Sequence, residues 1–215
     1  MSLLEILQPN EDYLFKRDAI SGVVVGIVTN NEDPDGLGRI KIKFPWLSDE
    51  HESDWARVVS IMAGNGRGVF FLPEVDDEVL VAFEFGDIRK PLVLGGLWNG
   101  VDTPPIDNAD GENNIRLIHS RSGHMIRLDD TDGSEKIEII GKGEEDKIVI
   151  DTEKNAITIS VAGDITLSAP DGKITLECNE LELNASSSAK LVSDQSADVE
   201  AGATLNLKGQ TVNIN

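Results

Sequence analysis

Aromatic side chains are missing from the second half of this sequence. All three Trp, all six Phe and the single Tyr of the 215-residue chain lie before residue 99. A conventional globular core relies on some aromatic volume. We therefore expect the second half to bury small and β-branched side chains in a narrow, regular space.

The chain is also poor in cysteine and in basic residues. Its single cysteine, Cys178, excludes an intrachain disulfide. The formal net charge is −20, and residues 1–110 carry 9 basic and 20 acidic groups, a balance of −11. A surface this acidic repels phosphate groups, so we expect no nucleic-acid partner.

No stretch approaches the run of about 18 apolar residues that a membrane-spanning helix needs, and no signal peptide opens the chain. We therefore expect the protein to be assembled in the cytoplasm.

Residues 20–102 alternate between short apolar segments and turn formers. Arg39–Phe44 alternates strictly between polar and apolar residues, as a half-buried strand does, and Glu78–Phe85 is a further strand candidate. The intervening segments 30–38 and 63–68 are rich in Gly, Asn and Asp. Short strands without helical periodicity predict a small closed Greek-key barrel of the OB type, because closure removes the exposed sheet edges.

Two segments flank this barrel. Residues 1–19 form an N-terminal arm, in which Ser2–Leu7 has the pattern of a short helix that stops at Pro9. Residues 103–114 form a linker, because their Pro pair, Gly and Asn run cannot extend a sheet.

From Ile115 the sequence becomes periodic. Apolar-x-apolar triplets begin at residues 115, 126, 137 and 148, a spacing of 11, and recur at a mean spacing of about 8 as far as residue 212. One short strand per octad leaves an apolar face that a lone chain cannot cover, whereas three chains about a common axis can cover it. Residues 115–215 are therefore predicted to form a triple-stranded β-helix in an intertwined homotrimer, and the complete fold to be all-β.

The core of this predicted needle consists of aliphatic side chains in the triplets. They are Ile148, Ile150, Ile157, Ile159, Ile165, Leu167, Ile174, Leu176, Leu181, Leu183, Leu205 and Leu207.

The barrel and the entry to the needle resemble the central-spike proteins of contractile injection machines. These are phage baseplate assembly protein V and the spike half of the VgrG proteins of type VI secretion and related systems. The motifs that carry the resemblance are Val25–Asn30, Asp33–Ile42, Phe44–Leu47, Trp55–Val58, Phe71–Val75, Glu78–Val81, Gly95–Asn99, Ser120–His124 and Leu128–Gly133.

The resemblance implies a structural, membrane-piercing spike. Such a spike is a homotrimer beneath the tail tube, in a virion baseplate or injection particle, with its barrels on a hub protein and its β-helix pointing at the target membrane. VgrG proteins carry hub domains in front of the barrel, whereas only the 19-residue arm precedes it here, so we expect a separate hub protein. Some phage spikes insert a peptidoglycan-cleaving domain where this chain has its 12-residue linker.

The C-terminal stretch Thr211–Asn215 contains no His, Cys or carboxylate side chain. We therefore expect no apical metal. A shaft that ends on a bare strand suggests a docking face for a PAAR-type tip protein, formed by Val212, Ile214 and Asn215.

Other candidate sites are weak. The three histidines are scattered, Asp129–Gly133 lacks the downstream Glu of a calcium loop, and Gly64–Gly68 lacks the Lys-Ser/Thr of a phosphate loop. We expect no cofactor and no enzymatic activity. The alternatives are a trimeric tail fibre or adhesin that binds a receptor and, with less support, a cell-wall hydrolase.

Overall fold

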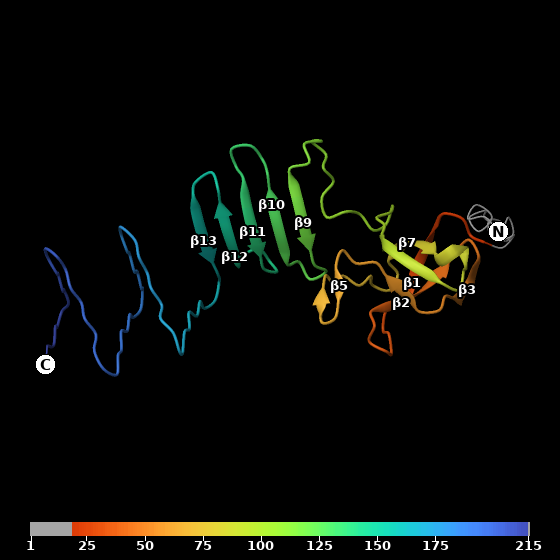
Figure 1. Cartoon of the computed structure of the whole chain (residues 1–215). Coiled ribbons are helices and arrows are strands. Elements are labelled where there is room, and N and C mark those ends of the chain that lie inside the picture. The colour runs from red at the N-terminus through yellow and green to blue at the C-terminus, as the bar shows by residue number, and fades with distance from the viewer. Residues whose placement is uncertain (1–18, 215) are drawn as a thin grey trace, which may run out of the picture. The chain divides into compact units, whose positions relative to one another are not determined.

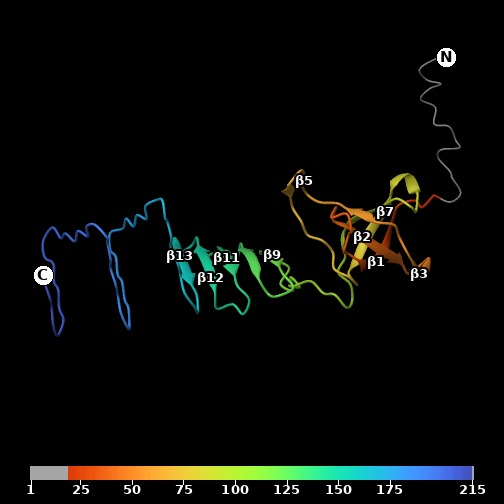
Figure 2. The same cartoon turned by 90° about the horizontal axis from the view of Figure 1, so that it is seen from below.

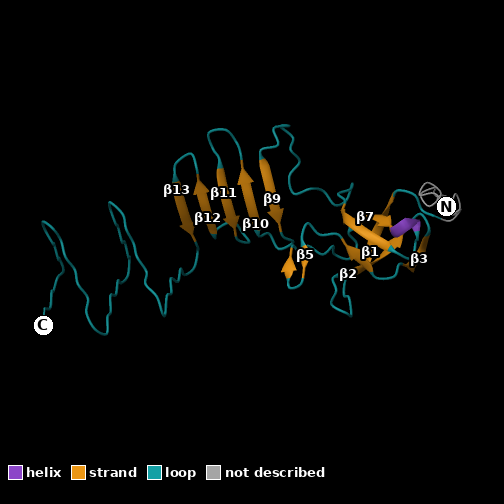
Figure 3. Cartoon of the chain, viewed as in Figure 1, coloured by secondary structure: helices purple, strands orange, loops and turns teal. Residues whose placement is uncertain are grey.

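The computed structural model describes residues 19–214, and for residues 48–50 the backbone only. In this range the fold is all-β except for one 3-10 turn, η1 (Glu84–Gly86) (Figure 3). The predicted helix at Ser2–Leu7 lies outside the described residues. Two compact units, Met1–Ser160 and Val161–Asn215, divide the chain.

Five strands of the first unit close into a barrel (Figure 2). Around the ring, β1 pairs with β7, β7 with β8, β8 with β4, β4 with β2, and β2 again with β1. Only the β4–β8 pairing is parallel. The strands are β1 (Val23–Asn30), β2 (Arg39–Phe44), β4 (Ala56–Val58), β7 (Glu78–Phe83) and β8 (Pro91–Gly96), with β3 (Ser48–Glu52) attached to β2. The predicted closed barrel of the OB type is confirmed.

Strict alternation along two strands explains where the barrel core lies. In β2 and β7 every second side chain is buried, and both strands show the same burial pattern. A pleated strand sends alternate side chains to opposite faces, so these buried residues point into the closed ring. The core consists of Val28, Ile40, Ile42, Phe44, Ala56, Val79, Val81, Phe83 and Val93.

Gly26 lies at a point of close approach inside the barrel. It belongs to β1, which pairs on both sides, with β2 and with β7. A Cβ placed on Gly26 would overlap Ile42 Cγ2 and would lie 3.3 Å from both the Lys43 carbonyl oxygen and Phe44 Cε1. The residue is therefore glycine because its neighbour strand fills the space that a side chain would need.

The β1–β2 connection is organised by one aspartate. The Asp33 carboxylate accepts hydrogen bonds from the backbone N–H groups of Asp35, Leu37 and Arg39 at 3.1 Å each. It also accepts two from the Arg39 guanidinium, at 2.8 and 2.7 Å, and its side chain is only 3% exposed. These bonds hold the pKa of Asp33 well below its usual range, the Arg39 side chain contributing most.

A second sheet of the first unit contains five strands in sequence order, as Figure 1 shows. All of its pairings are antiparallel. The strands are β9 (Ile115–His119), β10 (Met125–Asp129), β11 (Lys136–Ile140), β12 (Lys147–Asp151) and β13 (Ala156–Ser160). Strands β10, β11 and β12 begin 11 residues apart, so the 11-residue repeat in the sequence corresponds to one strand and one turn.

Residues 161–214, the described part of the second unit, contain no strand. The octad triplets at Ile165, Ile174, Leu181 and Leu205 were expected to be strands. A strand needs a neighbouring backbone to receive its hydrogen bonds, and the single chain supplies none at these triplets. The triple-stranded arrangement remains a prediction.

Replacing Gly26 by alanine should destabilise the barrel. We expect the free energy of unfolding to fall by about 1–3 kcal/mol, because the added methyl group must displace Ile42 or the β2 backbone. The measurement is thermal unfolding followed by Trp fluorescence, which reports on this half of the chain alone. Gly95→Ala is the matched control, since a Cβ there meets nothing within 4 Å. Equal stabilities of the two variants would contradict this account of Gly26.

Replacing Asp33 by asparagine should flatten the pH dependence of barrel stability. A carboxyl whose pKa is lowered on folding stabilises the fold above its unfolded pKa of about 3.9, and this stabilisation is lost as the pH falls through the folded pKa. Arg89 likewise lowers the pKa of Asp87, to about 2. We therefore expect the melting temperature of the barrel to decrease as the pH is lowered from about 4 to about 2.

Mutation can distinguish the contributions of Asp33 and Asp87 to the pH dependence of stability. Arg89 is 80% exposed, so its pair with Asp87 is screened by solvent. Asp87→Asn should therefore change the pH profile less than Asp33→Asn does. A wild-type profile in the Asp33→Asn variant would show that this aspartate does not organise the loop.

Candidate assembly surfaces

One face of the five-stranded sheet is almost entirely aliphatic. The antiparallel register aligns its side chains into two rows that cross all five strands. The first row is Ile118, Ile126, Ile139, Ile148 and Ile159, and the second is Arg116, Leu128, Ile137, Ile150 and Ile157. The aliphatic members are between 38% and 71% exposed, so this face is an uncovered apolar surface.

The opposite face of the sheet is mixed: apolar side chains such as Ile115, Leu117 and Met125 lie beside charged residues that pair with one another. Glu138 is only 6% exposed. It accepts a hydrogen bond from Arg127 Nε at 2.6 Å and lies 3.7 Å from Lys136 Nζ. The two faces therefore differ in chemistry: the opposite face contains a paired cluster of charges, whereas the two rows are aliphatic at every position but one and are the better suited to a dry contact.

The predicted needle-core residues fall into two groups. Ile148, Ile150, Ile157 and Ile159 come together on the aliphatic face. The remainder lie in the second unit, where each is more than half exposed and the structure brings none of them into a sheet. They are Ile165, Leu167, Ile174, Leu176, Leu181, Leu183, Leu205 and Leu207.

The predicted tip-docking residues are described only in part. Val212 is 51% and Ile214 is 86% exposed, and Asn215 lies outside the described residues.

Five members of the face were missing from the predicted core list: Ile118, Ile126, Leu128, Ile137 and Ile139. The signal was present for four of them, because the triplets at 126 and 137 follow the same alternation.

The triplet that begins at Ile115 does not contribute its apolar residues to the aliphatic face, because Ile115 and Leu117 point to the opposite face. β9 pairs Ile118 with Ile126, so its contribution to the rows is Arg116 and Ile118. A single-residue slip reverses the face of every side chain in a strand.

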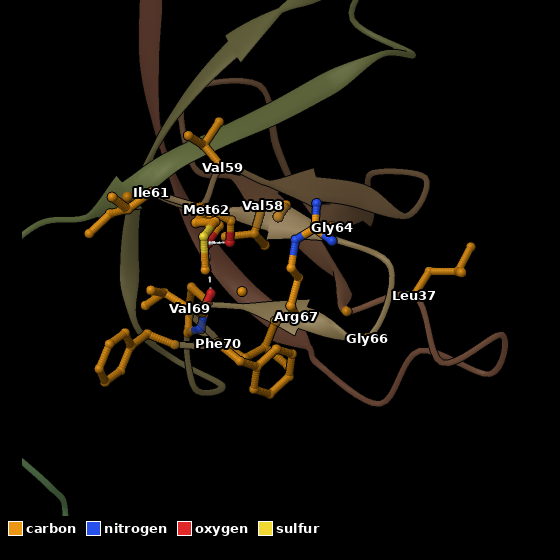
Figure 4. Close-up of a pocket in the computed structure, with 18 of the residues that line it drawn as sticks. Leu37, Val58, Val59, Ile61, Met62, Gly64, Gly66, Arg67, Val69 and Phe70 are labelled. Atoms are coloured by element: carbon orange, nitrogen blue, oxygen red, sulfur yellow. Dashed lines mark hydrogen bonds between the residues drawn. The ribbon is translucent and has the colours of Figure 1, made fainter.

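A second apolar surface is a groove of about 790 Å³ on the barrel (Figure 4). It lies beside the hairpin of β5 (Ala63–Gly64) and β6 (Arg67–Gly68). Among its lining residues Ile61 is 94% and Phe70 is 76% exposed. Arg67 is its only charged lining residue, so the groove contrasts with the acidic remainder of the chain.

The groove is held in shape by short-range contacts. The Ser60 hydroxyl lies 3.0 Å from the Met62 carbonyl oxygen and 2.6 Å from that of Val69. Gly38 has a φ of 68°, and a Cβ there would lie 3.2 Å from the Phe70 ring. The loop after β1 therefore packs directly against the aromatic wall of the groove.

Within residues 19–214 no three His, Cys, Asp or Glu side chains are placed to hold a metal ion. His124 Nδ1 accepts a hydrogen bond from the Lys142 backbone N–H at 3.1 Å, which gives this histidine a structural contact. The described residues also contain no helix that is long and apolar enough to span a membrane.

The barrel has relatives of known type. Residues 24–98, which include all five barrel strands except the first residue of β1, match the family described as the type VI secretion system/phage-baseplate injector OB domain. The barrel belongs to the injector OB family. The resemblance to central-spike proteins, stated above from the barrel motifs, is confirmed.

Curated relatives extend the match beyond the injector OB barrel. The type VI secretion system spike protein VgrG1a of Pseudomonas aeruginosa is 30% identical over 141 residues, which covers 60% of this chain and 22% of that protein. The corresponding VgrG3 of Vibrio cholerae is 33% identical over 111 residues, or 48% of this chain and 11% of that protein.

Another relative is named for an enzymatic activity. The actin cross-linking toxin VgrG1 of Vibrio cholerae is 32% identical over 111 residues, or 48% of this chain and 10% of the toxin. The chain thus spans less than a quarter of the length of each of these relatives. The similarity supports a spike-like structural role in secretion or baseplate machinery.

Proposed function

We propose that this protein is the membrane-piercing central spike of a contractile injection machine, and that it acts as a homotrimer. The observation that carries the proposal is the aliphatic face of β9–β13, which follows an injector OB barrel in the same chain. In this proposal residues 1–19 are the arm, 20–102 the barrel, 103–114 the linker and 115–215 the needle.

The energetics of the aliphatic face favour self-association. Complete burial of one exposed aliphatic side chain contributes about 1.5–3 kcal/mol, and these side chains are already about half buried. Burying the remaining area of both rows therefore contributes on the order of 10 kcal/mol per chain. The conformational entropy lost on association must be subtracted from this value. Left uncovered, such a surface promotes aggregation.

Threefold closure suits this face. Three copies, each turning its two rows toward a common axis, enclose a dry core without leaving an open edge. The core is then narrow, which explains why the second half of the chain contains no aromatic residue. Residues 161–214 repeat the alternation with exposed aliphatic side chains, so the same packing extends along the shaft.

The role requires further partners. A separate hub protein of the baseplate would hold the barrels, the target membrane would be pierced by the needle, and a PAAR-type tip protein would dock on Val212, Ile214 and Asn215. The toxin relative raises the question of enzymatic activity. The match covers only 10% of that protein, and we propose a structural role without catalysis for this chain.

The mass of the native protein tests the trimer. We expect a species of three times 23.3 kDa by native mass spectrometry, because the aliphatic rows need partners. Ile148→Lys places a charge in the first row and should reduce the trimer strongly. Thr158→Lys is its matched control, since Thr158 pairs with Val149 on the opposite face of the sheet.

A fragment of residues 1–114 locates the interaction within the chain. It should fold, as judged by Trp fluorescence, and should be mostly monomeric. A tight trimer of this fragment would assign trimerisation to the barrel instead. A monomeric full-length chain, or clearing of peptidoglycan in a zymogram, would contradict the proposed function itself.

A further inference from the structure

Arg116 is the one charged residue in the two aliphatic rows. Register places it opposite Leu128, so it occupies the β9 position of the second row. Every other position in that row, from β10 to β13, holds Leu or Ile. An arginine at this point marks the end of the apolar face that is nearest the barrel in sequence.

The guanidinium of Arg116 forms only part of its possible hydrogen bonds within its own chain. Its Nη1 donates to the Asn113 carbonyl oxygen at 3.0 Å and to Asp130 Oδ2 at 2.7 Å. Among the described residues, Nε and Nη2 of Arg116 and Oδ1 of Asp130 form no hydrogen bond. The two side chains are 55% and 59% exposed, so donors and acceptors remain open to another molecule.

The occupant that complements this arrangement is a second copy of the same chain. Three copies around an axis bring three Arg116 and three Asp130 side chains to one end of the core. Guanidinium groups alone would repel one another there, whereas an alternating ring of guanidinium and carboxylate groups is favourable. The planar guanidinium can bond two carboxylates at once, one through each edge.

We propose that Arg116 of each chain binds Asp130 of its neighbour, and that this ring sets the register of the three chains. The inference rests on the proposed homotrimer. The remaining positions of the rows repeat Ile or Leu from strand to strand, so they do not by themselves distinguish one alignment of the three chains from another. A slip by one strand would place the guanidinium against Leu128 or Ile137 of a neighbour, where its charge would be buried without a partner. A single polar residue in an apolar seam has this effect in coiled coils.

Charge reversal at either position tests the ring. In Arg116→Glu all groups of the ring are acidic, and in Asp130→Arg all are basic. The comparison is made at the temperature where half of the wild-type trimer has dissociated. There the trimer population of each variant, measured by native mass spectrometry, should be on the order of tenfold lower than that of the wild type. Trp fluorescence checks that the barrel remains folded in each variant. Lys154→Glu is the matched control, because Lys154 pairs with Asp151 within one turn at 2.7 Å.

Coexpression separates contacts between chains from contacts within one chain. In the proposed ring, residue 116 of each chain meets residue 130 of the next chain. A mixed trimer of Arg116→Glu and Asp130→Arg chains then contains two contacts between opposite charges and one between like charges. Mixed trimers should then recover most of the lost thermal resistance. If the pair acts only within a chain, every chain keeps its own repulsive pair and mixing restores nothing.

The outcomes distinguish this inference from the proposal beneath it. Wild-type trimers with unimpaired single variants, or impaired variants that mixing does not rescue, would overturn the ring and leave the trimer standing. A wild-type chain that is monomeric would overturn both. Rescue by mixing, together with an unaffected Lys154→Glu control, would establish the contact between neighbouring chains.

Discussion

The need to cover one aliphatic sheet face governs the organisation of this protein. In β9–β13 the antiparallel register stacks isoleucines on isoleucines across five strands. A sheet of this kind can turn one face to water, but only when that face is polar. Here three charged residues of the opposite face, Arg127, Lys136 and Glu138, pair with one another. The aliphatic face contains no such cluster of charges, and its side chains stay uncovered in the single chain.

The barrel is stabilised in a different way. Its ring of five strands closes on itself, and its apolar core is complete within one chain. Asp33 and Arg39 then fix a connection that would otherwise be a flexible turn. The barrel therefore needs no partner to complete its core, whereas the sheet that follows it leaves one aliphatic face uncovered.

Local alternation predicted much of the fold. Arg39–Phe44 was predicted as a strand with its observed bounds, because its alternation is strict and no turn former interrupts it. The β5–β6 hairpin was not predicted, since a segment rich in glycine has no side-chain pattern to follow. The apolar segment Val69–Pro73 has the composition of a strand, but its Phe70 and Phe71 are exposed and form part of the groove wall.

The aliphatic face shows a different limit. Its existence follows from the repeat, but the membership of β9 depends on how that strand pairs with β10, and this is a long-range property. The sequence pattern selected Ile115 and Leu117, whereas pairing selects Arg116 and Ile118. For the same reason the arginine in the second row could not be recognised from the sequence, because Arg116 looks like the polar middle residue of an apolar triplet.

The barrel and the shaft constrain their sequences to different degrees, for a physical reason. A closed barrel core depends on particular volumes at particular positions, such as the glycine at 26 that lets β1 approach Ile42, so its sequence is constrained residue by residue. A stacked aliphatic row asks only for a β-branched or similar side chain at every second position. Many sequences meet that condition equally well, so the rows constrain the identity of each residue less than the barrel core does. In residues 161–214 the features that carry information are therefore the alternation itself and the exposed aliphatic side chains that it produces.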